Sequence, residues 1–475
     1  MIIYKYIKKQ ILSKEEKRMK KTDLLVIGGS AGGILAAQMA RKAYGDIDVT
    51  LIRETERVMV PCGIPYIFGT LRNIEKNVIP DAMLHKSGIN LVIDTATAID
   101  RENKVVETKV NGSIAYKKLI IATGSLPIIP SFIPGYDLKN VFPILKDEDY
   151  LQNIYDKLEV AKNVVVIGGG FIGVEFAEQI RLLGKNVTLI EMAESCLWQA
   201  FDKKYTDDIE SLLKDNGINL MTSTKVDRIL GDKAVESVEI EGGKIIPADM
   251  VILGLGMKPN GNLAKDCGLA LNEKGAIKVD QYMRTSDPDI FAVGDCAEKN
   301  CFFTGKDAPI LLASTAAMEA KIAGSNAFQL RLIRANKGTI STFSTKIYDK
   351  TFAAAGLTEA RAREEGYCIM IGEYRTMDRH PGSLPGAQEV NIKLIFSKCS
   401  GIILGAQISG GDTVAEIINI LSLAITKDIT ATELNTFQTA THPLVSSSPI
   451  AYPINAAAMN AISTNCRHLN EDVII

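Results

Sequence analysis

The sequence predicts an α/β protein built around two copies of one strand–turn–helix unit. In the first copy, an apolar strand pattern over residues 23–27 runs into a glycine-rich turn over 28–33, and a helical pattern follows. The same order of strand, turn and helix recurs over residues 163–183. Units of this kind form parallel sheets covered by helices. A chain of 475 residues also exceeds a single compact core, so we expect more than one domain.

The two glycine-rich turns are typical of Rossmann-like dinucleotide-binding domains. Their glycines allow the backbone to approach a pyrophosphate, which binds the free amides and positive dipole end of the following helix. One such hexapeptide is weak evidence, whereas two copies in the correct strand–helix context are specific. The candidate cofactor-binding residues of the two turns are Gly28, Ser30, Ala31, Gly33, Gly168, Gly170, Phe171, Ile172 and Gly173.

The second strand of each unit ends at a residue of different charge. In the second copy this residue is Glu191, whose carboxylate can accept hydrogen bonds from a ribose 2′-hydroxyl and would repel a 2′-phosphate. We therefore expect the second site to prefer NADH over NADPH. In the first copy Ser30 replaces the middle glycine, and Arg53 stands where the acid is expected. The next residue, Glu54, is the candidate ribose ligand of that site.

The composition and charge exclude several classes of protein. The formal net charge of −2 gives no electrostatic footprint for nucleic acid. No run approaches ~18 apolar residues, so no membrane span is expected. Eight cysteines without a secretory signal indicate reduced thiols in the cytoplasm, and four histidines without metal-site spacing predict no bound metal. Residues 1–21 are a basic extension, expected to be solvated, with a partner-binding or membrane-surface helix as the alternative.

Three further segments complete a set of motifs. Residues 118–125 hold an Ala-Thr-Gly turn after an apolar strand, residues 285–295 end in Gly-Asp, and residues 61–66 carry one cysteine after the second strand. With the two turns, they make the chain resemble the pyridine nucleotide-disulfide oxidoreductases. The closest branch has a single active cysteine and contains coenzyme A disulfide reductases, NADH-dependent persulfide or polysulfide reductases, NADH oxidases and NADH peroxidases. The candidate cofactor-binding residues in these motifs are Ala122, Thr123, Gly124, Gly294 and Asp295.

The resemblance implies two cofactors and a homodimer. FAD would occupy the first nucleotide site, with Asp295 on its ribitol, and NADH would occupy the second. Two Rossmann-like domains would then be followed by an α+β dimerisation domain. The implied division is a basic extension over 1–21, the FAD domain over 22–143 and 276–338, the NAD domain over 144–275, and the dimerisation domain over 339–475.

Cys62 is the candidate redox-active residue. We expect it at the start of a helix, where the dipole and free amides lower the thiol pKa; Gly63 leaves room, and Pro65 suits a first turn. The alternative is a small buried residue in a turn. Two-cysteine relatives carry a partner cysteine where this chain has Ile67. The second sulfur must therefore come from a small substrate, such as a coenzyme A thiol, a persulfide or a peroxide-derived sulfenic acid.

One residue of the first turn bears on the electron acceptor. Oxidases and peroxidases of this branch commonly carry a histidine where this chain has Ala31, and an alanine transfers no proton to a peroxide-derived oxygen. This difference favours an enzyme that passes electrons from NADH through FAD and Cys62 to a disulfide, persulfide or polysulfide. The alternatives are an NADH oxidase or peroxidase that reduces O₂ or H₂O₂, and a flavin reductase of a small electron-carrier protein.

Three further residues have candidate roles, each with a structural alternative. His442 lies in a His-Pro pair that resembles the motif of two-cysteine reductases, where the histidine protonates a leaving thiolate across the dimer interface. The acid that orients such a histidine would fall at Ser447, so the dyad is incomplete, and a structural hydrogen-bonding histidine is the alternative. Glu175 matches a catalytic-site glutamate near the flavin of relatives, or is a solvated helical residue. Phe171 matches a gating aromatic residue, or is a core residue.

Overall fold

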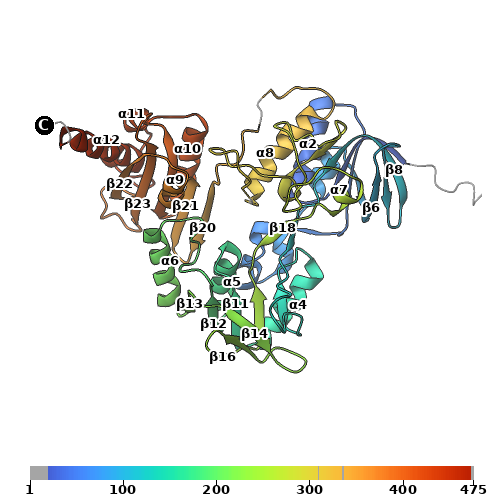
Figure 1. Cartoon of the computed structure of the whole chain (residues 1–475), viewed down its shortest axis with the longest axis horizontal. Coiled ribbons are helices and arrows are strands. Elements are labelled where there is room, and N and C mark those ends of the chain that lie inside the picture. The colour runs from blue at the N-terminus through green and yellow to red at the C-terminus, as the bar shows by residue number, and fades with distance from the viewer. Residues whose placement is uncertain (1–19, 309, 334–335, 472–475) are drawn as a thin grey trace, which may run out of the picture.

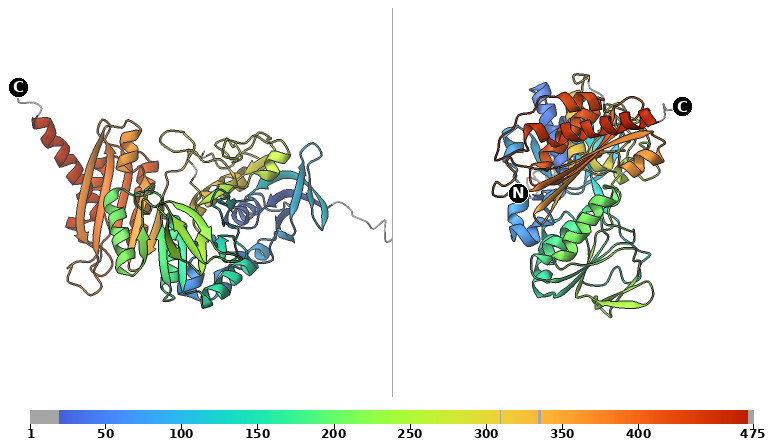
Figure 2. Two further views of the ribbon diagram at one scale, coloured as in Figure 1. Left: turned by 60° about the horizontal axis from the view of Figure 1, so that its bottom comes forward. Right: turned by 90° about the vertical axis from the view of Figure 1, so that its left-hand side faces the viewer.

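The computed structural model describes residues 20–308, 310–333 and 336–471. Figure 1 shows three parts, of which the first and the C-terminal part lie at opposite ends; the left view of Figure 2 agrees. The basic extension up to residue 19 lies outside the described residues. Its last two residues, Lys20 and Lys21, begin strand β1 (Lys20–Ile27), which starts earlier than the apolar pattern predicts.

The first part is a mixed sheet built from two separate stretches of the chain. Strands β5, β2, β1, β8 and β19 run parallel, and β7 and β6 continue the sheet antiparallel from β8. Helices α2 (Ala31–Tyr44) and α8 (Ala313–Asn326) pack against each other. The second stretch of the chain, which contains β19 and α8, therefore belongs to the same domain as the first. The other strands are β2 (Val49–Arg53), β5 (Asn90–Ile93), β6 (Ala96–Asp100), β7 (Val105–Thr108), β8 (Gly112–Ile121) and β19 (Ile290–Ala292).

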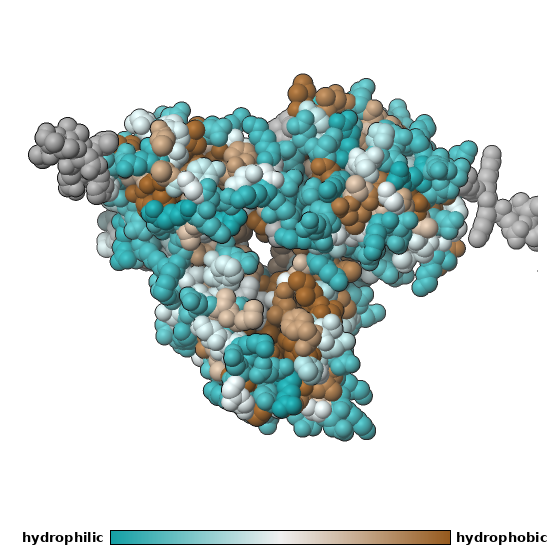
Figure 3. Space-filling view, viewed as in Figure 1, coloured by the Kyte–Doolittle hydropathy of each residue, from teal (hydrophilic) through white to brown (hydrophobic). Residues whose placement is uncertain are grey.

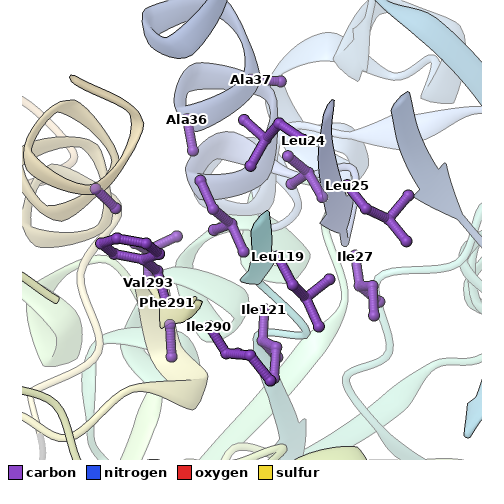
Figure 4. Packing of buried hydrophobic residues seen from close by; sticks show 14 of the residues in the cluster. Leu24, Leu25, Ile27, Ala36, Ala37, Leu119, Ile121, Ile290, Phe291 and Val293 are labelled. Carbon is purple, nitrogen blue, oxygen red and sulfur yellow. The ribbon is translucent and has the colours of Figure 1, made fainter. Parts of the chain in front are cut away.

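Aliphatic side chains from neighbouring strands form the core of this part. Leu24 of β1, Leu119 of β8 and Phe291 of β19 are buried, and Figure 4 shows them in one cluster beneath α2. Strands of a parallel sheet covered on both faces are apolar throughout, and each such side chain contributes about 1.5–3 kcal/mol on burial. Because β1 and β8 pair with Ile27 opposite Ile121, the first glycine turn and the Ala-Thr-Gly turn leave the sheet side by side.

The second part is a five-stranded parallel sheet in the order β10, β17, β11, β12, β13. A three-stranded antiparallel sheet, β14–β15–β16, lies beside it. Strand β10 precedes the boundary predicted at residue 144, but Val141 pairs with Val251 of β17 and so joins this sheet. The elements are β10 (Val141–Pro143), α4 (Glu148–Val160), β11 (Asn163–Ile167), α5 (Phe171–Arg181), β12 (Asn186–Ile190), α6 (Lys203–Asp215), β13 (Asn219–Met221), β14 (Val226–Leu230), β15 (Ser237–Ile240), β16 (Lys244–Pro247) and β17 (Met250–Leu253).

A short ribbon connects the two nucleotide-binding parts. Strand β9 (Ser125–Pro127) pairs antiparallel with β18 (Met257–Pro259), so the chain leaves and re-enters the first part at one place. The hydroxyl of Thr123 donates to the carbonyl of Asn260 at 2.6 Å beside this ribbon. The crossing therefore sits directly next to the Ala-Thr-Gly turn.

The third part is an antiparallel sheet in the order β20, β21, β24, β23, β22, with helices α10 and α12 packed on it. An ionic network ties it to the second part: Lys393 Nζ donates to Asp202 at 2.8 Å and to Glu359 at 2.6 Å. The elements are β20 (Phe343–Ile347), β21 (Lys350–Gly356), α9 (Glu359–Glu364), β22 (Ile369–Met377), β23 (Glu389–Ser397), β24 (Ile403–Gly410), α10 (Val414–Thr426), α11 (Ala431–Thr436) and α12 (Pro453–Glu471).

Short elements fill the connections. Among them are the turns that carry the predicted cysteine and the Gly-Asp motif. These elements are β3 (Val58–Met59), η1 (Pro61–Gly63), η2 (Ile67–Leu71), η3 (Ile74–Asn77), β4 (Val78–Ile79), α3 (Ala82–Lys86), α7 (Asn262–Asp266), η4 (Gly294–Cys296) and η5 (Pro449–Ala451).

Candidate active site

A cavity of about 470 Å³ lies where the three parts meet. Figure 3 shows the surface hollowed at this place, with apolar side chains along one rim. Its wall combines the start of α2, the cysteine segment, the Ala-Thr-Gly turn, the start of α5, η4 and β20. The predicted site residues that line it are Ser30, Ala31, Cys62, Ala122, Gly124, Phe171, Ile172, Glu175, Gly294 and Asp295.

The first glycine turn forms a cradle that only glycine permits. Gly28 has φ +115°, and a Cβ there would lie 2.1 Å from the carbonyl oxygen of Ala122. A Cβ on Gly33 would lie 1.9 Å from the carbonyl oxygen of Gly28. Ser30 is the N-cap of α2, but its side chain makes no capping hydrogen bond. The first amides of α2 therefore have no side-chain cap, as a pyrophosphate-binding turn requires.

The second glycine turn repeats this geometry. Gly168 has φ +107°, and a Cβ on Gly173 would lie 1.8 Å from the carbonyl oxygen of Gly168. The carboxylate of Glu191 accepts hydrogen bonds from the amides of Gly169 and Ala193, the latter at 2.7 Å. The acid at the end of β12 is therefore held against the turn, where a ribose would lie.

The residues of the first site that correspond to Glu191, namely Arg53 and Glu54, are placed differently from it. Arg53, at the end of β2, is buried and forms an ion pair with Asp81 at 2.5 Å. Glu54 is exposed, and its carboxylate lies 3.4 Å from the hydroxyl of Thr95. Glu54 does not line the cavity, so its role as a ribose ligand stays a prediction.

The segment that carries Cys62 corrects one expectation. Cys62 lies in the 3₁₀ turn Pro61–Gly63, which leads through turn residues into the π-helix Ile67–Leu71, so it stands at the start of an irregular helical run and not of a regular α-helix. Its side chain is exposed on the cavity wall. Burial by surrounding atoms raises the pKa of the Cys62 thiol, and the nearby Glu175 carboxylate raises it further. The expected fall of this pKa is wrong for the polypeptide alone, because burial and the Glu175 carboxylate both oppose ionisation.

Apolar residues after Cys62 anchor this segment to the second part. Ile67, at the position of the partner cysteine of relatives, is fully buried and packs in one cluster with Ile64, Phe68 and Phe176. The rings of Phe68 and Phe176 are 5.4 Å apart between centroids. Cys62 is therefore held at the joint between the two nucleotide-binding parts, and no second sulfur lies at Ile67.

Glu175 is a buried acid that faces the cavity from α5. Burial raises its pKa to about 7, although the Thr345 hydroxyl of β20 donates a hydrogen bond to it at 2.9 Å. The neighbouring acid Glu178 accepts the backbone amide of Tyr348 at 2.6 Å. A carboxyl group with this pKa can hold or release a proton near neutral pH, as a general acid or base must.

Two aromatic rings, those of Phe171 and Phe343, pack together at the N-terminus of α5. Phe171 lines the cavity, and its ring packs edge-to-face on Phe343 of β20, with 5.0 Å between centroids. Ile172 lines the cavity beside it. The structure thus gives Phe171 both a packing partner and cavity access, and a gating role stays a prediction.

Asp295 also lines the cavity, where it belongs to a polar cluster. The hydroxyl of Ser125 donates to its carboxylate at 2.7 Å. The ammonium group of Lys146 lies 3.7 Å from the same carboxylate and 3.3 Å from the Ser125 hydroxyl. Sequence patterns did not single out Lys146, because it comes from an irregular connection far from the other motifs.

A buried ion pair supports this wall from behind. Glu319 of α8 accepts the amide of Gly294 at 2.8 Å, while Lys299 donates to the carbonyl of the same residue at 2.6 Å. The ammonium and carboxylate groups of the pair are 3.1 Å apart, and both side chains are almost fully buried. Gly294, directly before Asp295, is therefore held at both its amide and its carbonyl.

Gly254 is a second residue that sequence reasoning missed. A Cβ on Gly168 would lie 2.6 Å from its carbonyl oxygen, so it stands to the second turn as Ala122 stands to the first. The signal was present: a buried strand, β17, runs directly into Gly254 and Gly256, as β8 runs into the Ala-Thr-Gly turn.

His442 does not reach the cavity of its own chain. It is exposed in the loop before η5, its amide donates to the Ser446 hydroxyl at 2.8 Å, and its Nδ1 accepts the Leu444 amide at 3.3 Å. Ser447, where an orienting acid would fall, is buried. Within one subunit, Cys62 and His442 are not brought together.

Among the described residues, no group of three or more histidine, cysteine, aspartate or glutamate side chains is arranged to hold a metal ion. In the same part of the chain, no helix combines the length and apolar character needed to cross a bilayer.

Comparison with known families decides the identity of this architecture. Residues 22–320 match the family described as pyridine nucleotide-disulphide oxidoreductase, and residues 342–450 match its dimerisation domain. The chain belongs to this family. The predicted family, the fold class of two Rossmann-type domains with a C-terminal dimerisation domain, and the cofactors FAD and NAD(P)H are thereby confirmed. The chain is an FAD-dependent NAD(P)H oxidoreductase.

Relatives and solved structures cover most of the chain. An NADH oxidase of Methanocaldococcus jannaschii is 33% identical over 450 residues, covering 92% of this chain and 98% of that protein. An NAD(P)H coenzyme A polysulfide/persulfide reductase of Pyrococcus horikoshii is 34% identical over 430 residues, covering 88% and 95%. The solved NAD-dependent persulfide reductase of A. fulgidus has a TM-score of 0.86 at 33% identity, covering 94% of this chain and 84% of that chain.

The two glycine cradles fit the cofactors of the family. In both turns a glycine packs so closely on a carbonyl oxygen that no side chain fits, and no side chain caps the first amides of α2 or α5, which suits a pyrophosphate. The cavity wall then carries a thiol, a buried acid and the Asp295 cluster around one space. This donor set suits a flavin ring with a thiol on one side.

Proposed function

We propose that this enzyme uses NADH to reduce a disulfide, persulfide or polysulfide through Cys62. The observation that supports the proposal is the number of cysteines that line the cavity. Among the described lining residues Cys62 is the one cysteine, and the position of a partner cysteine is filled by the buried Ile67. The second sulfur of the redox pair therefore has to arrive with the substrate.

The relatives support this substrate class. The P. horikoshii protein is named a coenzyme A polysulfide/persulfide reductase, and the A. fulgidus structure is a persulfide reductase. The M. jannaschii relative is named an NADH oxidase, which makes oxygen reduction the second candidate function. Ala31 favours the sulfur reaction, because its methyl group at the cavity wall offers no proton to a peroxide oxygen.

FAD, when bound, relays two electrons from the nicotinamide to sulfur. The thiolate of Cys62 attacks a substrate disulfide, so that a Cys62–substrate disulfide forms and one thiolate leaves. Two electrons from NADH then return Cys62 to its thiolate and release the second sulfur as a thiolate. Overall, one disulfide, one NADH and one proton give two thiols and NAD⁺.

Other residues are proposed to transfer protons and to select the nucleotide. Glu175, with a pKa of about 7, is positioned to exchange a proton beside Cys62. His442 of the partner subunit is the proposed proton donor to the leaving thiolate. Glu191, held against the second turn, is proposed to bind the ribose hydroxyls of NADH and to disfavour NADPH.

A homodimer in the cytoplasm is part of the proposal. The family's dimerisation domain matches residues 342–450, and three apolar side chains near His442 are exposed in a single subunit: Leu444 by 51%, Val445 by 62% and Ile450 by 94%. Exposed apolar residues of this kind favour a partner surface. The seven described cysteines are all free, as in a reducing compartment.

The test compares electron acceptors under identical conditions. NADH oxidation by the holoenzyme would be followed with coenzyme A disulfide, polysulfide, peroxide and oxygen in parallel, beside Cys62→Ser. We expect a sulfur acceptor to be preferred and its reduction to be abolished in the variant. Preference for oxygen or peroxide would establish the second candidate instead, and full sulfur reduction by Cys62→Ser would reject Cys62 chemistry.

A further inference from the structure

Lys299 and Glu319 form the most buried ion pair of the described residues. Their side chains are 3% and 0% exposed, and the ammonium and carboxylate groups lie 3.1 Å apart. Neither residue lines the cavity, and protein atoms cover both, so their contacts do not depend on what occupies it. Replacing such a pair by apolar residues is often neutral or stabilising, because both charges lose their hydration on burial. The pair is therefore better explained by what it holds than by stability.

The pair holds the turn η4 at its start and directly after its end. Lys299 Nζ donates to the carbonyl oxygens of Gly294 at 2.6 Å and of Ala297 at 2.8 Å. Glu319 accepts the amide of Gly294 at 2.8 Å. Hydrogen bonds with one charged partner are stronger than those between neutral groups. The backbone of η4 is therefore fixed by side chains that lie behind the cavity wall.

Gly294 packs closely on α8 and on the start of α2. It has φ +76°, and a Cβ on it would lie 3.6 Å from the Cβ of Ala316 on α8. A Cβ on Gly32 of α2 would lie 3.9 Å from the Cα of Gly294. Asp295 is the next residue of η4, and its carboxylate accepts the hydroxyl of Ser125, directly after the Ala-Thr-Gly turn, at 2.7 Å. A shift of Gly294 would therefore move Asp295 relative to the first glycine turn and the Ala-Thr-Gly turn.

We propose that Lys299 and Glu319 are positioning residues that fix Asp295 for the binding of FAD. The inference goes beyond the sulfur reaction and rests on the predicted role of Asp295 as a ligand of the FAD ribitol chain. The pair acts through the shape of η4. Its loss should therefore speed the release of FAD, and this effect should disappear when Asp295 is already changed.

Release of FAD from the holoenzyme measures this role without turnover. In Lys299→Met/Glu319→Gln both buried charges are removed together, and the glutamine keeps an acceptor for the Gly294 amide. Free FAD would be separated by ultrafiltration and followed over time by its absorbance. We expect the dissociation rate to increase about tenfold to a hundredfold, as for the loss of hydrogen bonds to a charged group. An unchanged rate would overturn the inference.

A control variant separates this effect from the loss of another ion pair of the same sheet. Lys118 of β8 pairs with Asp289, which directly precedes β19, whereas η4 follows the end of that strand. Lys118→Met should release FAD at the native rate. Denaturant unfolding of both variants reports their stability. A rate in Lys118→Met that rises as much as in the double variant would mean general destabilisation and would overturn the inference.

A double-mutant cycle tests the route through Asp295. Asp295→Asn should itself release FAD faster, and adding Lys299→Met/Glu319→Gln to it should change the rate by less than about threefold. The same factor in both backgrounds would mean that the pair does not act through Asp295, and would overturn the inference. Where a variant is purified without FAD, dissociation constants for added FAD replace the rates in the same comparison.

A milder variant decides if the double variant does not fold. Glu319→Gln leaves Lys299 and its two carbonyl contacts in place, and it should increase the dissociation rate about threefold to tenfold, with no further increase in Asp295→Asn. An unchanged rate, or an equal increase in both backgrounds, would overturn the inference. Failure of the proposed function is distinguishable, since it would appear as sulfur reduction that survives Cys62→Ser, whatever the rate of FAD release.

Discussion

The two glycine turns share one backbone and differ in the charge that faces it. In both, the amide of the first glycine donates a hydrogen bond at 2.8 Å to a carbonyl near the end of the second strand: Gly28 to Ile52 and Gly168 to Ile190. Beyond that strand, Glu191 turns its carboxylate onto the second turn. Arg53 instead directs its guanidinium to Asp81, and its stem packs on Gly29. The two turns thus have similar backbones, and a different side chain follows each of them.

The helices after the two turns extend this difference. Glu175 of α5 occupies the place that Leu35 occupies in α2, counting from the first residue of each helix. Leu35 packs against the core of the first part, whereas Glu175 is a buried acid in the cavity. The same helix position therefore carries a packing residue in the first unit and a buried acid with a raised pKa in the second.

Alanine at the first glycine of each turn should have the largest effect. Gly28→Ala would place a Cβ 2.1 Å from a carbonyl oxygen at φ +115°, so we expect protein without FAD. Gly168→Ala should keep FAD but lose reduction of the flavin by NADH. Flavin absorbance of the purified variants and NADH titration measure the two losses.

Gly45→Ala and Gly184→Ala are matched controls. Both glycines have positive φ, at +66° and +77°, but no atom lies within 4 Å of their added Cβ. They should retain both functions, which separates backbone strain from the clash at the turn. A Gly28→Ala enzyme with full FAD content would contradict the assignment of FAD to the first glycine turn.

The second effect concerns nucleotide choice. Glu191→Gln keeps the size of the side chain but removes its charge, and the preference for NADH over NADPH, measured as a ratio of kcat/KM values, should fall about tenfold to a hundredfold. Arg53→Gln serves as the comparison at the first turn and should not alter this ratio. An unchanged ratio in Glu191→Gln would remove the acid as the basis of nucleotide selection.

The third effect is a pH dependence of stability. The pKa of Glu175 rises from 4.5 to about 7 on folding, so the native state binds more protons than the unfolded chain between these values. The free energy of unfolding should therefore decrease as the pH rises from 5 to 8, by about 2–3 kcal/mol from this group. Denaturant unfolding of Glu175→Gln should show a smaller decrease.

Part of the slope should remain in that variant. Glu319 also has a pKa raised by burial to about 7, so it contributes in the same direction. The exposed Glu54→Gln is the control and should keep the native slope. A slope in Glu175→Gln equal to that of the native enzyme would mean that Glu175 is ionised in the folded state.

The smallest effect concerns FAD affinity. If Glu54 is the ribose ligand of the first site, Glu54→Gln should weaken FAD binding about threefold, as expected for one exposed hydrogen bond. The dissociation constant of FAD, measured by fluorescence on reconstituted apoprotein, reports this change. Equal affinity would leave the first turn with no acidic ribose ligand at this position and would widen the difference between the two turns.

Much of the candidate site was predictable because its signals are local. Each glycine turn, the Ala-Thr-Gly segment and Cys62 lie within a few residues of a strand end, where the chain direction alone determines their place. Gly254 carried a similar local signal and was overlooked. The absence of a second cysteine at Ile67 was also readable, and its burial explains how the position is filled.

The sequence by itself determined the family, the two cofactors and a cysteine that lines the cavity, since these depend on motifs that fold locally. The tertiary structure alone decided the electrostatics. The helical run that Cys62 begins is irregular and lies beside Glu175, and the cation Lys146 lines the same cavity from the connection between β10 and α4. Burial and charge at a point depend on neighbours from several segments, so a pKa follows from the folded arrangement and not from the order of residues.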